Sequence, residues 1–305
     1  MVSLSQVPAI RARLRRTYSV EAELLFVALV LLAWQAIRIP LEGNLEVSLA
    51  HADSVLGFER ALSVDVEGAV IERVSEAGLT PLLTWLYTNI HLPVLFAFLA
   101  AVRLYDPARY PRVRTIFALS FVPAVFVIGL YPLAPPRWHA AFGLEPAPTH
   151  ADLAGTTAVL MHNSTAAAAS QHFGFAVFVA AVSLWIFPRS RLALVALAYP
   201  ALVFLVIVGT GNHYVVDCVI GTATFALAAL AARYLHGREP SRSPAPLPGV
   251  FGAALGYGLV VWAIVDLNLM NPRSPANLLP AFVLAAGIAG VLIPRLAKEP
   301  VAESS

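Results

Sequence analysis

The stretch GTGNHYVVDCVIG, residues 209–221, decides the fold class and points to the site. It stands between two strongly apolar runs, ALVALAYPALVFLVIV before it and TATFALAALAA after it. Ionisable side chains are costly inside a bilayer and usually mark function when they occur there. His213 and Asp217 are four residues apart, so a helix would place them on one face. The pattern therefore predicts chemistry at the end of a membrane span.

The composition supports a membrane protein. The chain is 59% hydrophobic and 12% charged, with a mean hydropathy of +0.75. Soluble domains are about half apolar and about a quarter charged. The single cysteine, Cys218, excludes an internal disulfide framework. The arginine-rich start leads into an apolar run without a clear cleavage site, so we expect that run to stay as a span.

We predict an all-α, polytopic membrane helical bundle. A helix needs about 20 mostly apolar residues to cross the hydrocarbon layer. Eight stretches meet this need: 20–39, 82–104, 114–133, 166–187, 192–209, 213–233, 250–268 and 278–296. The predicted organisation is a basic cytoplasmic N-terminus 1–19, a six-span core 20–238, a cytoplasmic linker 239–249, two additional spans 250–296 and a cytoplasmic tail 297–305.

The loop charges predict the orientation. With eight spans, 15 of the 20 Lys and Arg residues fall on the side that holds both termini or at its edge. The positive-inside rule makes that side cytoplasmic, in a plasma or inner membrane. Residues 44–79 mix charges with apolar residues at helical spacing. They fit one or two helices lying in the extracytoplasmic interface, or an ordinary amphipathic linker.

Three polar motifs lie at span ends on the predicted outer face. They are LAPPRW (133–138), ASQHFGFA (169–176) and GTGNHYVVD (209–217). A helical bundle could bring them together, because all three lie at similar depth. The site is therefore predicted to open at the extracytoplasmic face.

The chemistry of these residues suits a phosphate. Asp217 can hold one nitrogen of His213 protonated and leave the other as a nucleophile or base. Arg137 offers a forked donor to phosphate oxygens, and His172 can act as a general acid. The glycines before His213 and the N-terminus of the following helix could present backbone N–H groups to the same anion. An arginine, two histidines, a carboxylate and backbone N–H groups together indicate phosphoryl transfer through a phosphohistidine.

At these residues the sequence resembles the type-2 phosphatidic acid phosphatase superfamily, most closely its inositol phosphorylceramide synthase-like branch. The motifs are Pro135-Pro136-Arg137, Ala169-Ser170-Gln171-His172 and Asn212-His213-Tyr214-Val215-Val216-Asp217. Order and spacing agree over about residues 80–235. The segments FERALSVDVE (58–67) and LYTNIHLP (86–93) also resemble that branch.

The resemblance implies a six-helix phosphatase-like core that uses no metal and no cofactor. It implies two sets of site residues: His213 as nucleophile, Asp217 to orient it and His172 as acid, then Arg137, Ser170 and Asn212 to bind phosphate. The second motif departs from the family, with Ala169 for a proline and Gln171 for a small or apolar residue. Ile207 and Leu130 stand where the broader superfamily has an arginine and a lysine.

These residues favour an enzyme that cleaves a lipid phosphoester and transfers the phosphoryl group to an inositol-type alcohol or to water. Alternatives are a simple lipid-phosphate or isoprenyl-pyrophosphate phosphatase, and a lipid-binding or transport protein without catalysis. Zinc hydrolysis is a third option, through the outer-loop residues His139, His150, Asp152 and His162. Tyr87, Asn89 and His91 are candidates to line the substrate cavity, or to hydrogen-bond between helices. No nucleic acid partner is expected.

Overall fold

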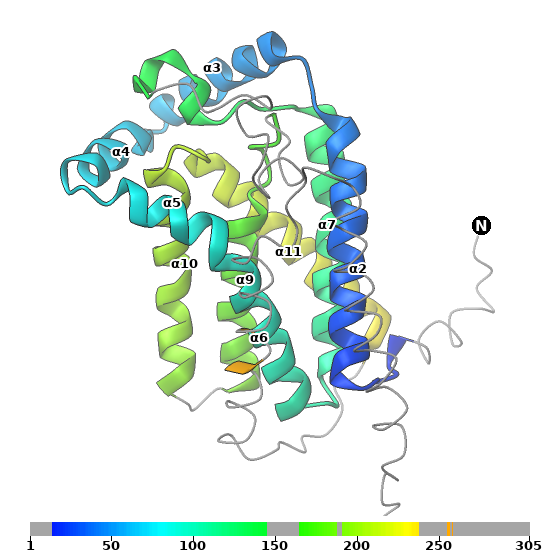
Figure 1. The fold of residues 1–305 in the computed structure, drawn as a ribbon. Helices are drawn as coiled ribbons and strands as arrows, with labels where there is room; N and C mark the ends of the chain where they lie inside the picture. Colours follow the sequence, from blue (N-terminus) through cyan, green and yellow to red (C-terminus); the bar gives the residue numbers. More distant parts are fainter. Residues whose placement is uncertain (1–13, 145–164, 188–190, 238–254, 257, 259–305) are drawn as a thin grey trace, which may run out of the picture.

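The computed structural model describes residues 14–144, 165–187, 191–237, 255–256 and 258. In these residues the chain is helical, in agreement with the predicted class (Figure 1). The α-helices are α2 (Val20–Arg38), α3 (Leu45–Ala61), α4 (Glu67–Glu76), α5 (Thr80–Asn89), α6 (His91–Tyr105), α7 (Tyr110–Leu130), α9 (Gln171–Ile186), α10 (Arg191–Gly209) and α11 (Val215–His236). Short 3-10 turns are η2 (Ile39–Leu41), η3 (Pro136–Trp138) and η4 (Ala140–Phe142).

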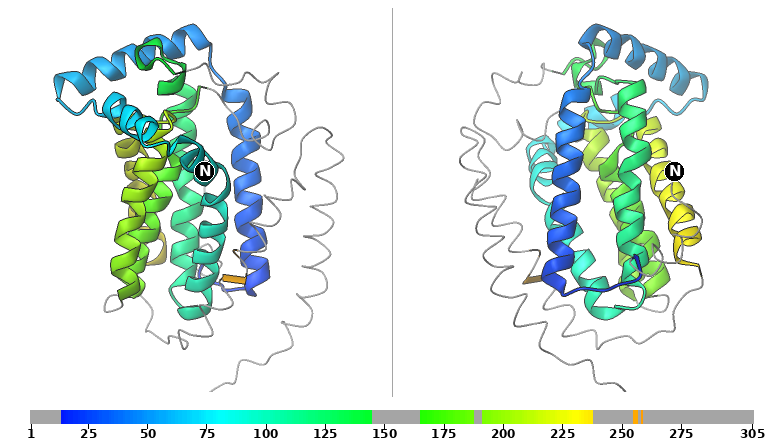
Figure 2. Two further views of the ribbon diagram at one scale, coloured as in Figure 1. Left: turned by 60° about the vertical axis from the view of Figure 1, so that its left-hand side comes forward. Right: turned by 90° about the vertical axis from the view of Figure 1, so that its right-hand side faces the viewer.

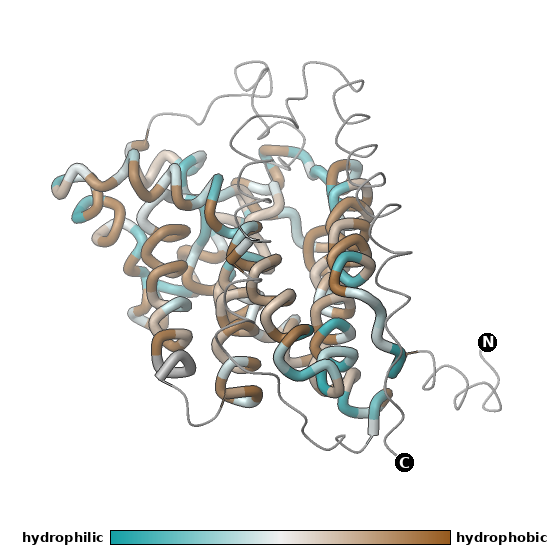
Figure 3. Tube along the Cα trace, turned by 60° about the horizontal axis from the view of Figure 1, so that its bottom comes forward, coloured by the Kyte–Doolittle hydropathy of each residue, from teal (hydrophilic) through white to brown (hydrophobic). Residues whose placement is uncertain are grey.

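Three of these helical segments are long and apolar enough to cross a membrane. They are Val20–Leu41, Tyr110–Leu130 and Val215–His236. Two shorter apolar helical segments, Gln171–Ile186 and Val195–Gly209, run in the same bundle. Figure 3 shows that apolar residues predominate along the bundle helices. The chain therefore has the helices of an integral membrane protein.

The stretch expected to form one span over 82–104 is bent, although its two helices together are long and apolar enough to cross a membrane. The structure divides it into α5 and α6, which bend by 46° at Ile90. Pro93 explains the break, because it has no N–H to give the carbonyl of Asn89 and its ring clashes with that carbonyl. Hydropathy did not reveal the break, since apolar residues continue across it.

The segment 44–79 forms two helices, within the expectation of one or two helices for these residues. Asn44 starts α3 by accepting hydrogen bonds from the backbone amides of Glu46 (2.8 Å) and Val47 (3.2 Å). Helices α3 and α4 make a hairpin that lies across one end of the bundle (Figures 1 and 2). This outer hairpin, residues 45–76, covers the end at which the polar motifs meet.

Helix α11 is central to the packing, with α7 and α9 against it. Gly174 of α9 and Gly221 of α11 allow this contact. A methyl group on Gly221 would stand 2.2 Å from the Ser170 carbonyl oxygen, and one on Gly174 would stand 2.7 Å from the Gly221 carbonyl oxygen. The two helices thus touch through their backbones, and this contact brings the second and third motifs together.

The opposite end of the bundle carries a buried ion pair. Arg114 donates to both carboxylate oxygens of Glu23, at 2.8 and 2.9 Å, and links α7 to α2. Arg109 lies 3.8 Å from Asp106 in the turn between α6 and α7. Basic residues therefore gather at the end away from the polar motifs. The predicted spans 250–268 and 278–296, the linker 239–249 and the tail 297–305 fall outside the described residues, apart from positions 255, 256 and 258.

Candidate active site

The first and third motifs are joined through Arg137, which stands on the turn η3. The Arg137 backbone N–H donates to the Gly211 carbonyl at 2.9 Å, and its guanidinium donates to the Asn212 side-chain oxygen. Gly211 has φ +65°, a conformation that favours glycine, and a Cβ there would lie 3.2 Å from the Arg137 Cβ. Arg137 Nε is buried and has no hydrogen-bond partner among the described residues. The guanidinium therefore retains a donor for a ligand.

His213 is held by a backbone carbonyl that sequence reasoning missed. Its Nδ1 donates to the Ala167 carbonyl oxygen at 3.0 Å, while Asp217 Oδ2 lies 3.4 Å from the same nitrogen. The Ala167 backbone is fixed in turn, because its N–H donates to the Leu133 carbonyl at 3.1 Å. With Nδ1 occupied, Nε2 of the neutral ring keeps its lone pair for a reacting atom.

Asp217 does more than face the imidazole. Its Oδ2 accepts from the Tyr214 backbone N–H at 2.9 Å and caps the start of α11. The next two amides, of Val215 and Val216, donate to Glu67 and Glu59, both at 2.7 Å. The expectation that this helix N-terminus binds the substrate anion was therefore wrong, since the chain's own carboxylates occupy it.

His172 comes from the first turn of α9. Its ring centroid lies 6.0 Å from that of His213. It stacks on Tyr87 and packs against His91, each at 4.5 Å between centroids. One guanidinium, two imidazoles and a carboxylate thus meet at one end of the bundle.

Ser170 takes a structural position. Its side chain accepts from the Phe173 amide at 3.3 Å as the N-cap of α9, and its own N–H donates to the Asp217 carbonyl at 3.2 Å. The residue is fully buried. Ala169 before it has φ +61°, which a proline cannot adopt. The departure from the family's proline therefore comes with a backbone that a proline would not permit.

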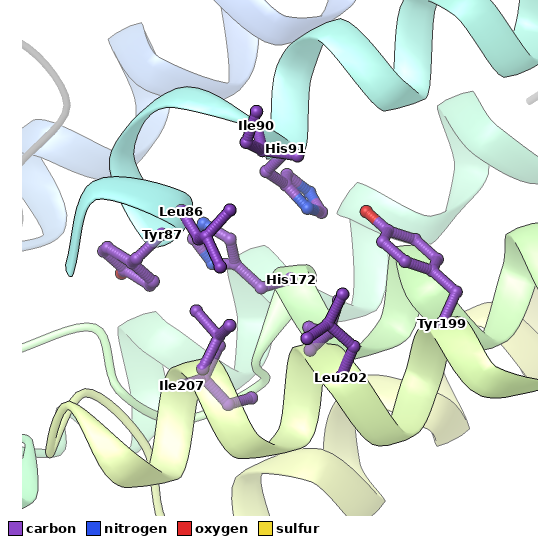
Figure 4. A pocket seen from close by; sticks show the side chains of 10 residues that line it. Leu86, Tyr87, Ile90, His91, His172, Tyr199, Leu202 and Ile207 are labelled. Carbon is purple, nitrogen blue, oxygen red and sulfur yellow. The ribbon is translucent and has the colours of Figure 1, made fainter. Parts of the chain in front are cut away.

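A pocket opens beside His172 (Figure 4). Tyr87 and His91 line it together with His172 of α9 and mainly apolar side chains of α5 and α10, among them Leu202 and Ile207. Asn89 is not among the lining residues, and its amide donates to the Trp85 carbonyl at 3.0 Å.

The electrostatics favour the neutral form of the His213 imidazole. Burial lowers the pKa of His213 to about 3, the hydrogen bond to Ala167 opposes this shift, and the guanidiniums of Arg137 and Arg38 add to it. Burial also lowers the pKa of Arg137, although Tyr87 opposes that change. Arg38, in the last turn of α2, interacts with His172 as well. The sequence alone does not single out Arg38, because only the packing brings α2 to the motifs.

Of the residues considered for zinc, His139 pairs with Asp53 at 3.0 Å. His150, Asp152 and His162 lie outside the described residues. Within the residues that the structure does describe, no three His, Cys, Asp or Glu side chains gather as metal ligands.

The family profile of the PAP2 superfamily matches residues 53–232. The match spans more than half of the chain and all three motifs. The chain belongs to the PAP2 superfamily. No curated protein matched the chain, and no solved structure matched it. Membership of the PAP2 superfamily indicates phosphatase or phosphotransferase activity on phosphoesters. The matched region excludes α2, so Arg38 is a feature of this chain that the family match does not cover.

Proposed function

We propose that this PAP2 superfamily protein cleaves a lipid phosphoester through a phosphohistidine on His213. The proposal rests on one observation: the His172 and His213 rings lie 6.0 Å apart beside the Arg137 guanidinium. With phosphorus next to His213, the leaving oxygen could take a proton from His172, and the attacking oxygen could give one to it. Positioned charges of this kind provide most of the catalysis in phosphoryl transfer.

The first step forms the phosphohistidine. Nε2 of His213 attacks phosphorus, and the bond from phosphorus to the leaving oxygen breaks. That oxygen takes a proton from the His172 imidazolium, a form that the bound anion favours. Arg137 and Asn212 contact the phosphoryl oxygens, and Asp217 helps to keep the His213 proton on Nδ1.

The second step regenerates the enzyme. The oxygen of water or of an alcohol attacks phosphorus, the P–N bond to His213 breaks, and neutral His172 accepts the acceptor's proton. The similarity of the motifs to the inositol phosphorylceramide synthase-like branch favours an inositol-type alcohol as acceptor. Water gives a phosphatase from the same residues, acting on a lipid phosphate or an isoprenyl pyrophosphate.

The pocket beside His172 supports a lipid as the substrate. Its lining is apolar on the side of α10 and α5, where Leu86, Ile90, Leu202, Val203 and Val206 stand. An acyl or isoprenyl chain would lie among these side chains while the phosphate reaches the histidines. Burial of each CH₂ group contributes about 0.8 kcal/mol, so a short stretch of chain suffices to hold the substrate.

We propose that the site faces the extracytoplasmic side of a plasma or inner membrane, with both termini in the cytoplasm. Arginines at the other end of the bundle support this, among them Arg103, Arg109, Arg112 and Arg114. Cytoplasmic ends of membrane helices carry an excess of Lys and Arg.

The test is turnover of head-group-labelled lipids by the purified protein in lipid nanodiscs. The panel contains phosphatidic acid, an isoprenyl pyrophosphate and phosphatidylinositol, with and without added inositol. We expect phosphate release or transfer, acid-labile label on the wild-type chain, and neither with His213→Ala. His236→Gln, which changes a buried histidine bonded to Thr115 at 2.9 Å at the other end of the bundle, is the matched control.

Three outcomes would overturn the proposal. Turnover by His213→Ala near the wild-type rate would show that His213 is not the nucleophile. Activity lost with a chelator and restored by zinc would indicate a metal hydrolase. Lipid binding without any turnover would indicate a non-catalytic protein.

A further inference from the structure

A second cluster of ionisable groups lies under the outer hairpin, next to the histidines. Glu59 of α3 is 0% exposed and Glu67 of α4 is 1% exposed. Glu59 Oε1 accepts from the Val216 amide and Glu67 Oε1 from the Val215 amide, both at 2.7 Å. The first amides of a helix have no partner within the helix, so each carboxylate satisfies a group that would otherwise be unpaired. The two bonds fix the outer hairpin to the start of α11.

The amides concerned directly follow the nucleophile. His213 precedes Val215 by two residues, and Asp217 closes the same turn by accepting from Tyr214 N–H. Any movement of the first turn of α11 therefore moves the His213 ring relative to Ala167, to which its Nδ1 donates. Arg137 would be displaced as well, because it is tied to the loop before His213 through Gly211.

The two carboxyl groups also meet each other. Glu59 Oε2 is buried and receives no donor from the described residues, while its carboxyl group is within hydrogen-bond reach of Glu67. Two carboxylates in such contact cannot both ionise without strong repulsion. One proton held between them satisfies Glu59 Oε2 and leaves each outer oxygen to accept from its amide.

We propose that Glu59 and Glu67 are positioning residues, a carboxyl pair that shares one proton and holds the nucleophile loop in its reactive geometry. The inference rests on the function proposed above. It assigns a role to the segment FERALSVDVE, which sequence analysis had noted only for its resemblance to a branch of the family.

The pair should respond to pH near neutrality. Burial and the neighbouring carboxylates of Glu67 and Asp217 raise the pKa of Glu59 from 4.5 to about 8, against the hydrogen bond from Val216. A raised carboxyl pKa means that the folded state favours the proton. The stabilisation is thus present at low pH and is lost as pH rises through about 8.

Within the residues that the structure describes, the groups that act on the pKa of Glu59 include no cation. The groups that interact with the pair or its neighbours are Asp217, the Tyr214 hydroxyl and the Cys218 thiol from α11, with Asp53 of α3 acting on Tyr214. All of these are acids. Loss of the shared proton therefore places unscreened negative charges under the hairpin and weakens its hold on α11.

The decisive variants are Glu59→Gln and Glu59→Ala. A glutamine at 59 can accept from Val216 N–H and donate its own N–H to Glu67, so it replaces the shared proton permanently. We expect kcat of the wild type to decline above about pH 8, and we expect this decline to be absent in Glu59→Gln. Glu59→Ala should lower kcat about 100-fold with little change in KM, because positioning is lost and binding is kept. Glu76→Gln, an exposed residue of α4 paired with Arg73 at 3.2 Å, is the matched control.

Hydrogen exchange separates this proposal from the proposed function, because it needs no turnover. We expect the amides of Val215 and Val216 to lose protection above about pH 8 in the wild type and to keep it in Glu59→Gln. The positioning role would be overturned if the Val215 and Val216 amides kept their protection in Glu59→Ala at every pH. It would also be overturned if active Glu59→Gln showed the same decline of kcat above about pH 8 as the wild type. Absence of turnover in the wild type and in Glu76→Gln would instead overturn the proposed function.

Discussion

Arg137, which we propose to bind the phosphate, has a donor geometry that a lysine could not reproduce. Its guanidinium donates to Asn212 while Nε stays available, so one planar group can bind its partner and a ligand together. Neither Ile207 nor Leu130 supplies the additional cation of the wider superfamily. The structure brings Arg38 to the histidines instead, from a helix outside the family match.

Replacement of Arg137 by lysine tests the forked donor. A lysine keeps the charge but offers a single point donor, so we expect kcat/KM to fall by about 100-fold. Steady-state kinetics on the best lipid substrate gives the value. Arg73→Lys, an exposed change on α4, serves as the control and should match the wild type. An equal rate for Arg137→Lys would show that charge alone is enough.

Gly211 offers a second test, because the chain contains a matched glycine. Both Gly211 and Gly143 have positive φ, +65° and +59°. A Cβ on Gly211 would meet Leu144 at 2.7 Å and Arg137 at 3.2 Å, whereas one on Gly143 meets nothing within 4 Å. Each alanine variant should lose about 1–2 kcal/mol of stability through backbone strain. Only Gly211→Ala should also lose most of its kcat. Similar kinetics in the two variants would contradict the role of this close approach.

The helices were predicted well where hydropathy decides them and poorly where single backbone groups do. The segments 20–39, 114–133, 192–209 and 213–233 correspond to α2, α7, α10 and α11 to within a few residues. The length of each apolar run was enough to predict these four helices. The break at Ile90 was missed although Pro93 signals it, because a hydropathy window averages over a missing N–H.

The site shows the same division. Arg137, His172, His213 and Asp217 could be brought together from the sequence, since a span count places helix ends on a common side. The Ala167 carbonyl could not, because any residue supplies a carbonyl and no side chain marks it. Glu59 and Glu67 were visible as acids in an amphipathic segment. Their contact with α11 depends on how the outer hairpin folds over the bundle, which periodicity does not determine.

The contact of α9 with α11 sets the separation of the two histidines. An alanine at Gly221 would place a methyl group 2.2 Å from the Ser170 carbonyl oxygen, so the helices must move apart. We expect a loss of about 1–3 kcal/mol in unfolding free energy from this overpacking. Activity should fall further than stability alone explains. Thermal unfolding and kcat measured on the same detergent-solubilised sample separate the two effects.

Gly68→Ala is the control for that experiment. It lies on α4, and a Cβ there meets nothing within 4 Å. Alanine favours a helix over glycine by about 1 kcal/mol, so this variant should be as stable as the wild type or more so. A Gly221→Ala protein with wild-type kcat would show that the distance between the rings tolerates the shift.

The whole molecule has two unlike ends, and this asymmetry predicts its orientation. The outer hairpin and the histidines lie at one end, and the turn between α6 and α7, with its arginines, lies at the other (Figure 1). From the positive-inside bias we expect the arginine end to lie in the cytoplasm. A substrate delivered from the cytoplasm would then have to cross the bilayer before it reaches His213.

Thiol labelling in intact cells or spheroplasts tests this orientation. The background is Cys218→Ala, which removes the chain's single cysteine. Ala77, just after α4, and Ala108, between α6 and α7, are both exposed and mark the two ends. We expect an impermeant reagent to label Ala77→Cys from outside and Ala108→Cys only after lysis. The reverse pattern would place the histidines in the cytoplasm. Labelling of both from outside would contradict a bundle that crosses the membrane between these positions.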